Sequence, residues 1–172
     1  MRRGAATIIA ASGAAIAAIS IASLVKFAPL LVWNASASAP IGLYQIERNK
    51  RLEVGDFVLV RSHEALTKFI AERGYLPENI PLLKRVAALP GHEICRESEA
   101  IMINEIRVAD AQIFDSFGRK LPAWSGCFTL QSSEIFLLND PENSLDGRYF
   151  GATKAKDVVG VAKPLWIREN DR

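Results

Sequence analysis

Short β-forming runs closed by turn-forming residues follow one another along most of this chain. We expect strands at residues 43–46, 56–61, 82–89, 100–103, 106–109, 128–130, 134–138 and 158–166. One run, residues 63–73, instead has apolar residues at helical spacing, with Ser62 placed to cap its start and Gly74 to end it. Strands at this spacing, with so little helix, predict a mainly β domain built as an antiparallel sheet with one or two short helices.

The start of the chain limits where that domain lies. Two arginines precede residues 4–25, which carry no charge, and the apolar character resumes after Lys26, from Phe27 to Trp33. About 20 apolar residues are enough to cross a bilayer as a helix, and arginines on the N-terminal side favour a cytoplasmic N-terminus. We therefore expect a single-pass membrane anchor over residues 1–33, with Trp33 at the lipid interface, and an exported domain over residues 34–172.

A cleavable signal sequence is the alternative for the same N-terminal segment. Ala35, Ser36 and Ala37 form a small-residue site of the kind at which secretory signals are cut. The apolar run is longer than the usual core of a signal sequence, which favours the retained anchor. Either alternative exports the domain that follows.

The composition excludes several classes of function. The formal net charge is +2, and the basic residues are scattered without interleaved aromatic residues, so no direct nucleic-acid binding is expected. The two cysteines are far apart in sequence, and the two histidines do not complete a zinc-binding pattern with them. We therefore expect no metal and no cofactor.

Two adjacent cations lie inside the otherwise apolar strand expected at residues 82–89. Because successive side chains of a strand point to opposite faces, Lys84 shares a face with Leu82 and Val86, while Arg85 points the other way. If that face is buried, desolvation lowers the pKa of the Lys84 amine, and a neutral amine can act as a general base. The alternative is an exposed edge strand, where lysine guards against aggregation.

Residues 34–44 follow the apolar N-terminal segment directly. They are small and hydroxylated and include Pro40 and Gly42, which predicts an irregular backbone that a substrate can approach closely. A serine held in such a segment acts as a nucleophile if a base lies within hydrogen-bond reach. A plain linker is the alternative.

A second polar segment, residues 139–151, combines turn formers with a hydroxyl, a carboxylate and a guanidinium. Asp146 and Arg148 can pair and fix this loop, and Ser144 can hold a lysine amine by hydrogen bonding. The alternative is an ordinary salt-bridged turn.

Three of these segments together, in this order, resemble the signal peptidase I clan of serine/lysine proteases, and most closely its conjugative-transfer branch, the TraF-type peptidases. Residues 38–44 (Ser-Ala-Pro-Ile-Gly-Leu-Tyr) resemble the nucleophile segment of that clan. Residues 84–91 (Lys-Arg-Val-Ala-Ala-Leu-Pro-Gly) resemble its general-base segment, and residues 143–151 (Asn-Ser-Leu-Asp-Gly-Arg-Tyr-Phe-Gly) its third segment. The resemblance therefore covers nearly the whole exported domain.

The resemblance implies a role for each matching residue. It makes Ser38 the nucleophile and Lys84 the general base that takes the serine proton. Ser144 would orient the lysine, and Asp146 with Arg148 would brace the site. The resemblance thus implies a Ser-Lys dyad within a domain of the signal peptidase fold.

The resemblance also implies an oxyanion hole formed by the backbone N–H of Ser38, with the hydroxyl of Ser36 as a second donor. The chain departs from the family at two positions beside the proposed site. His92 stands where the family commonly has Asp, and Gly147 where it commonly has Ser. The Ala-Pro pair after the nucleophile fits the transfer branch better than the general signal peptidases.

The compartment expected for the domain bears on its two cysteines. In an oxidising periplasm Cys95 and Cys127 can form a disulfide, which would stabilise the fold by constraining the unfolded chain. Two free buried thiols are the alternative.

The function implied is a serine endopeptidase anchored in the inner membrane, with its catalytic domain in the periplasm. Because the conjugative branch matures a pilin precursor, the expected partners are that precursor, inner-membrane lipid and the conjugative transfer machinery. The acyl-enzyme could be resolved by water or by the substrate's own amine, which would cyclise the pilin. The alternatives are a general signal peptidase that removes presequences, a Ser-His-Asp hydrolase using His63 or His92, and a non-catalytic assembly protein of the transfer apparatus.

Overall fold

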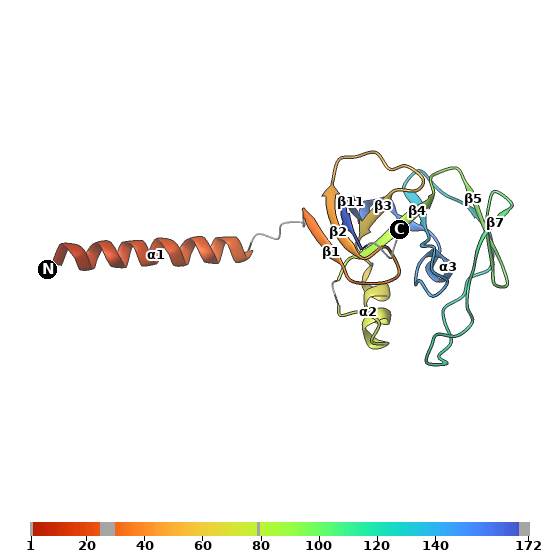
Figure 1. Ribbon diagram of the computed structural model, residues 1–172, viewed down its shortest axis with the longest axis horizontal. Coiled ribbons are helices and arrows are strands. Elements are labelled where there is room, and N and C mark those ends of the chain that lie inside the picture. Colours follow the sequence, from red (N-terminus) through yellow and green to blue (C-terminus); the bar gives the residue numbers. More distant parts are fainter. Residues whose placement is uncertain (1, 25–29, 79, 169–172) are drawn as a thin grey trace.

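The computed structural model of this chain describes residues 2–24, 30–78 and 80–168 (Figure 1). Its helices are α1 (Arg2–Leu24), α2 (Glu64–Glu72), α3 (Gly147–Phe150) and the 3-10 turn η1 (Ala155–Asp157). Its strands are β1 (Leu31–Asn34), β2 (Gly42–Glu47), β3 (Phe57–Val60), β4 (Leu82–Ala88), β5 (Glu93–Glu97), β6 (Ala100–Ile103), β7 (Ile106–Asp110), β8 (Gly126–Thr129), β9 (Glu134–Leu137), β10 (Thr153–Lys154) and β11 (Val158–Ile167).

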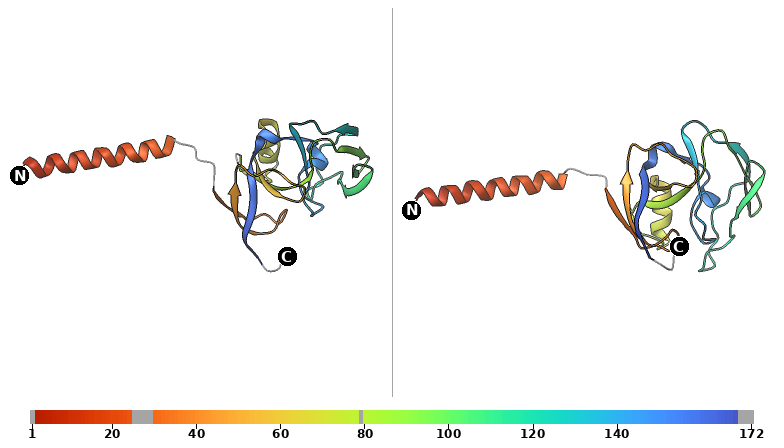
Figure 2. Two further views of the ribbon diagram at one scale, coloured as in Figure 1. Left: turned by 90° about the horizontal axis from the view of Figure 1, so that it is seen from above. Right: turned by 45° about the horizontal axis from the view of Figure 1, so that its top comes forward.

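The strands form two sheets with antiparallel pairings. The strand order is β1-β2-β11-β3-β4-β9-β10 in the large sheet and β7-β6-β5-β8 in the small sheet. Figures 1 and 2 agree that the small sheet, green to teal, lies on the opposite side of the domain from β1, which is orange. The turn at Pro90 and Gly91 carries the chain from the large sheet into the small one. The expected mainly β, antiparallel fold is confirmed.

Helix α2 is capped one residue later than predicted, by His63 and not by Ser62. Its N-cap is His63, whose Nδ1 accepts a 3.3 Å hydrogen bond from the Leu66 backbone N–H. Ser62, the residue predicted to cap this helix, instead accepts a hydrogen bond at its carbonyl from the Thr67 hydroxyl. The prediction of Ser62 as the cap is therefore wrong, because an imidazole nitrogen can accept the same N–H that a hydroxyl would.

The folded domain begins earlier than the expected boundary after Trp33. Residues 31–34 form β1, which pairs with β2 along its whole length, and the Trp33 ring stacks on Trp166 of β11 at 5.6 Å between centroids. The apolar residues 31–33, expected to belong to the anchor, thus complete the edge of the large sheet.

Within the described ranges, no helix combines the length and the apolar character that a membrane crossing requires. The membrane segment expected over residues 1–33 stays a prediction.

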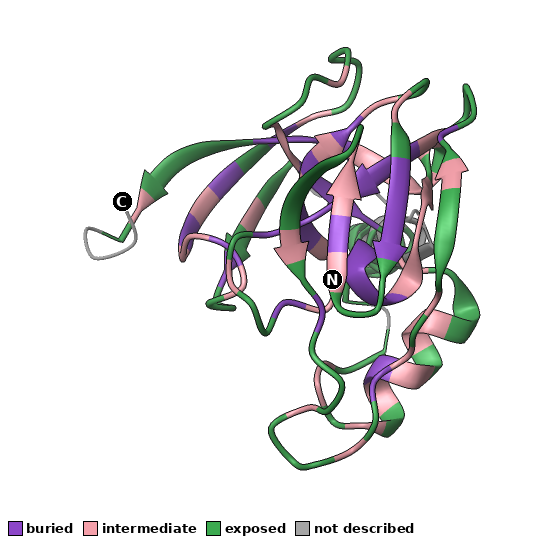
Figure 3. Ribbon diagram, turned by 90° about the vertical axis from the view of Figure 1, so that its right-hand side faces the viewer, coloured by how far each residue is buried: buried purple, intermediate pink, exposed green. Residues whose placement is uncertain are grey.

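Strand β4 lies in the interior of the large sheet. It pairs with β3, where Lys84 is opposite Val58, and with β9, where Val86 is opposite Leu137. The alternative of an exposed edge strand is therefore wrong. Figure 3 shows that buried residues, in purple, concentrate on the strands, whereas the loops at the ends of the domain are mostly exposed. The position of β4 inside the sheet therefore explains why Lys84 is desolvated.

Candidate active site

The loop between β1 and β2 is shaped by a buried asparagine that the sequence patterns did not single out. The side-chain amide of Asn34 donates hydrogen bonds to the carbonyls of Ser36, Ala39 and Pro40, at 2.9, 3.0 and 3.0 Å. Its Oδ1 accepts from the backbone N–H of Ser36 at 3.1 Å. One side chain thereby satisfies backbone groups on both sides of Ser38 and fixes the loop that carries this serine.

Two hydroxyls meet inside this loop. The Oγ atoms of Ser36 and Ser38 lie 3.0 Å apart in a hydrogen bond, and the Ser38 backbone N–H also points to Ser36 Oγ at 3.3 Å. The residues expected to form the oxyanion hole are thus adjacent. In the described structure, both the hydroxyl and the N–H of Ser38 have Ser36 as their partner.

Lys84 is buried at the other side of the site. Its side chain leaves the interior strand β4, only 5 % of the residue is exposed, and Nζ donates a 2.9 Å hydrogen bond to Ser144 Oγ. Burial lowers the pKa of the Lys84 amine to about 8, the nearby Asp146 carboxylate opposes this shift, and Arg148 adds to it. The amine is therefore poised to exchange a proton near neutral pH.

The segment that follows β9 holds Ser144 in place. Asp146 is the N-cap of the short helix α3, and its carboxylate accepts from the Arg148 backbone N–H at 3.2 Å and from the Asn139 backbone N–H at 3.0 Å. The Arg148 guanidinium contacts the same carboxylate at 3.1 Å and donates to the carbonyls of Asn139 and Pro141 at 2.6 and 3.0 Å. The expected Asp146–Arg148 pair thus closes the loop around Ser144.

Asn139 joins this loop to the lysine strand. Its amide donates to the Leu83 carbonyl at 3.1 Å, and its Oδ1 accepts from the Arg85 backbone N–H at 2.9 Å. Both bonds go to the residues on either side of Lys84. The sequence patterns missed Asn139 because an Asn-Asp pair after a strand indicates only a turn.

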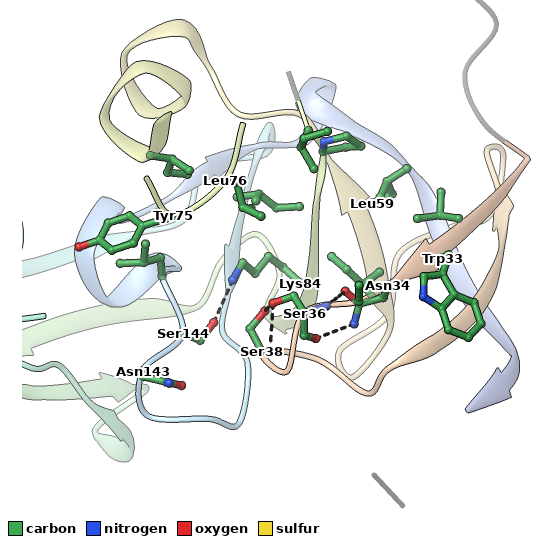
Figure 4. A pocket seen from close by; sticks show the side chains of 18 residues that line it. Trp33, Asn34, Ser36, Ser38, Leu59, Tyr75, Leu76, Lys84, Asn143 and Ser144 are labelled. Atoms are coloured by element: carbon green, nitrogen blue, oxygen red, sulfur yellow. Dashed lines mark hydrogen bonds between the residues drawn. The ribbon is translucent and has the colours of Figure 1, made fainter. Parts of the chain in front are cut away.

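One cavity brings the expected site residues together. Its volume is about 520 Å³, and its lining includes Ser36, Ser38, Lys84 and Ser144 together with apolar side chains of β1, β3, β4 and the segment after α2. In the close-up of Figure 4, the Lys84 side chain lies between Ser144 and the loop that carries Ser36 and Ser38. Asp146 and Arg148 do not line this cavity and support it from behind.

The two histidines lie elsewhere. His63 caps α2, and a His92 ring nitrogen lies 2.9 Å from the Leu89 carbonyl in the turn after β4. Neither lines the cavity that contains Ser38. The geometry therefore offers no Ser-His pair at this site.

Cys95 and Cys127 lie opposite each other on β5 and β8, and their sulfurs form a disulfide. Glu93 completes a group whose ligand atoms all lie within 4.8 Å of one another. Because both sulfurs are bonded to each other, this group offers no thiolate to a metal ion.

Close packing against β9 explains why position 147 holds a glycine. A Cβ atom there would lie 2.7 Å from Cε2 of Phe136 and 2.8 Å from the Leu137 carbonyl oxygen. A serine, common at this position in the resembling family, does not fit without movement of β9.

Comparisons with known proteins find one family and several relatives that are similar to this chain. Residues 3–167 match the family described as "Signal peptidase, peptidase S26". A "Conjugal transfer protein TraF" from Agrobacterium fabrum is 30% identical over 143 residues, which cover 77% of this chain and 80% of that protein. A "Plasmid transfer protein TraF" from Escherichia coli is 29% identical over 143 residues, with the same coverage. A signal peptidase I of known structure from Enterococcus faecalis V583 is 20% identical, covers 65% of this chain and 97% of its own, and superposes with a TM-score of 0.38.

Proposed function

Because this chain belongs to the peptidase S26 family, we propose that it is a serine endopeptidase with Ser38 as nucleophile and Lys84 as general base. The observation that carries the proposal is the shared cavity, into which a loop serine and a desolvated lysine amine both open. Burial of the amine favours its neutral form, and only the neutral form can accept the proton of a hydroxyl.

The proposed acylation step begins with a change of partner at Ser38. Its Oγ leaves Ser36 and attacks the carbonyl carbon of the scissile bond, while Lys84 Nζ takes the hydroxyl proton. The Ser38 backbone N–H and the Ser36 hydroxyl turn to the developing oxyanion. The carbon–nitrogen bond then breaks, Lys84 returns its proton to the leaving amine, and Ser38 holds the substrate as an ester.

The ester is resolved by a second nucleophile. Attack by water yields a carboxylic acid, and attack by the substrate's own N-terminal amine yields a cyclic peptide; both restore the Ser38 hydroxyl. Ser144 holds the Lys84 amine during both steps through its 2.9 Å hydrogen bond. Lys84 again takes the proton of the attacking group and passes it to the departing serine oxygen.

The proposed substrate is a pilin precursor of a conjugative transfer system. Support comes from the relatives, which carry the names of conjugal and plasmid transfer proteins. We further propose that the apolar segment before β1 anchors the chain in the inner membrane and that the domain, from β1 onward, acts in the periplasm. The uncharged run at residues 4–25 supports the anchor, and the Cys95–Cys127 disulfide suits an oxidising compartment.

Mass spectrometry of the pilin precursor, incubated with the purified chain, tests the reaction. The expected result is a cut precursor with the wild type, and an intact one with Ser38→Ala or Lys84→Ala. Loss of one further water from the product would identify cyclisation. Ser132→Ala, an exposed serine in the turn before β9, is the control and should cut normally.

The alternatives give different results in the same experiment. Cleavage that survives both Ser38→Ala and Lys84→Ala would contradict the proposed Ser-Lys dyad. Loss of cleavage with His63→Ala or His92→Ala would favour a histidine-dependent hydrolase. If no precursor is cut but pilus assembly still requires the chain, its role is assembly. Cleavage of exported proteins in general, with no preference for pilin, would indicate a signal peptidase. Carbonate extraction of membranes that carry the chain with and without residues 1–24 tests the anchor, because both forms keep β1.

A further inference from the structure

A buried carboxylate outside the catalytic loops lies behind the wall of the substrate cavity. Asp115 belongs to the loop that joins β7 to β8, and its side chain is 6% exposed. One carboxylate oxygen accepts from the backbone N–H groups of Phe117 and Arg119 at 2.9 and 2.8 Å, and the other accepts from Arg119 Nε at 2.7 Å. The loop therefore folds around this side chain.

The same carboxylate also contacts Tyr75, which lies between α2 and strand β4 of the large sheet. The hydroxyl of Tyr75 donates a hydrogen bond to Asp115 Oδ2, across 40 positions of sequence. Burial alone would raise the pKa of Asp115, but the hydrogen bonds from Tyr75, Arg119 and the Phe117 backbone hold it well below its usual range. Asp115 is therefore ionised at neutral pH.

Two arginines also join the end of α2 to the β7–β8 loop, and each donates to a carbonyl of the other segment. Arg73, the C-cap residue of α2, donates to the Lys120 carbonyl at 2.9 Å, and Arg119 donates back to the Arg73 carbonyl at 3.2 Å. The Arg119 guanidinium also lies over the Tyr75 ring, 5.2 Å from its centroid. The end of α2 is therefore tied to the β7–β8 loop by charged groups at several points.

The segment tied in this way forms one wall of the cavity that contains Ser38 and Lys84. Ile70 of α2, Tyr75 and Leu76 all line that cavity. In Figure 4, Tyr75 lies on the side of the cavity away from Trp33, and its hydroxyl points away from Lys84. The Tyr75 ring is thus available to a substrate on one side while its hydroxyl is held by Asp115 on the other.

We propose that Asp115 is a positioning residue for substrate binding, which acts through Tyr75 to hold the α2 wall of the cavity in place. This inference rests on the proposed peptidase function. The wall offers the Tyr75 ring and the apolar side chains of Ile70 and Leu76, so the part of the substrate that meets it is apolar. Asp115 does not line the cavity and has no role in the proton transfer between Ser38 and Lys84.

Steady-state kinetics on a peptide that spans the mapped pilin cleavage site test this inference. Tyr75→Phe removes only the hydroxyl that Asp115 holds, and Asp115→Asn removes the charge. Each variant is expected to raise KM about tenfold with kcat within about twofold of wild type, since a hydrogen bond to a charged group is lost away from the reacting atoms. The double variant should raise KM no further than Asp115→Asn alone, because that variant already disturbs the contact that Tyr75→Phe removes.

Asp110→Asn is the matched control, because this exposed carboxylate of β7 pairs, among the described residues, only with Arg107 and lies outside the cavity. Its KM should equal that of the wild type. Asp115→Asn leaves Arg73 and Arg119 without their carboxylate partner. If this variant does not fold, the KM of folded Tyr75→Phe alone tests the inference. An unchanged KM in folded Tyr75→Phe, additive effects in the double variant, or a loss confined to kcat would overturn the inference while leaving the peptidase function intact. A wild type that cuts no precursor would instead remove the proposed function, and this inference with it.

Discussion

The amine of Lys84 donates a 2.9 Å hydrogen bond to the hydroxyl of Ser144, across 60 positions of sequence. Lys84 comes from an interior strand and Ser144 from the loop that precedes α3, and 5 % and 1 % of these two residues are exposed. The Ser144 hydroxyl orients the Lys84 amine without the direct carboxylate contact that would raise its pKa. This contact is the geometric basis for the proposed role of Lys84 as a base.

Removal of the Ser144 hydroxyl is expected to slow the reaction. Ser144→Ala should reduce kcat by about tenfold to a hundredfold, because the Lys84 amine loses the group that orients it. KM should change little, and the thermal unfolding midpoint should stay close to that of the wild type. Activity within twofold of wild type would show that Lys84 is oriented by other groups.

The reaction should depend on pH through Lys84. The pKa of this amine is about 8, and the base must be neutral, so kcat/KM should rise with pH and level off above about 8. Below that value the amine carries a proton and cannot accept another. Lys84→Arg should be inactive at every pH, because a guanidinium stays protonated. A flat profile between pH 6 and 9 in the wild type would contradict this assignment.

Loss of the Asp146 carboxylate should destabilise the domain. In Asp146→Asn, the Arg148 guanidinium, whose side chain is 3 % exposed, loses its charged partner. An unpaired buried charge costs about 3 to 5 kcal/mol, so the free energy of unfolding in urea should fall by about that amount. The control is Asp140→Asn, since the Asp140 side chain is 75 % exposed and its ion pair with Arg85 contributes little. Equal stability of the two variants would argue against a structural role for the buried pair.

Reduction of the disulfide should also destabilise the domain. Cys95 and Cys127 are 32 positions apart, and closing a loop of that length constrains the unfolded chain by about 4 kcal/mol. Urea unfolding with and without a reductant measures the difference. The double variant Cys95→Ala/Cys127→Ala should match the reduced wild type and should not respond to the reductant.

Introduction of the family's common serine at position 147 should be unfavourable here. Gly147→Ser places a Cβ atom 2.7 Å from the Phe136 ring, and overpacking of this kind costs about 1 to 3 kcal/mol. The added variant Phe136→Leu removes part of the ring and should restore some of the lost stability. Wild-type stability in Gly147→Ser alone would show that β9 moves aside easily.

Several elements could be predicted from the chain because their signals are local. Alternating apolar residues and turn formers predicted most strands near their observed positions, and Ser38, Lys84 and Ser144 were named from motif segments that do line one cavity. The comparisons confirm the family that those segments resemble. Roles in catalysis stay predictions until the kinetic experiments are done.

Other features escaped prediction because local signals are ambiguous. An apolar stretch such as residues 31–33 suits the end of a membrane segment and an edge strand equally well, and only its pairing with β2 decides between them. Asn34 and Asn139 have the local pattern of turn residues, yet each satisfies backbone groups of a segment that forms the candidate site. Such a role depends on which carbonyls the fold leaves without a partner.

The amino-acid sequence by itself determined the strand periodicity, the order of the three motif segments and the choice of a lysine as the candidate base. Only the tertiary structure decided that β4 is an interior strand, that Ser144 reaches Lys84, and that Asp115 holds Tyr75 behind the cavity. The reason is physical. A residue's chemistry is local, but its desolvation and its hydrogen-bond partners come from segments distant in the chain, and those two quantities set the pKa and the orientation on which the proposed reaction depends.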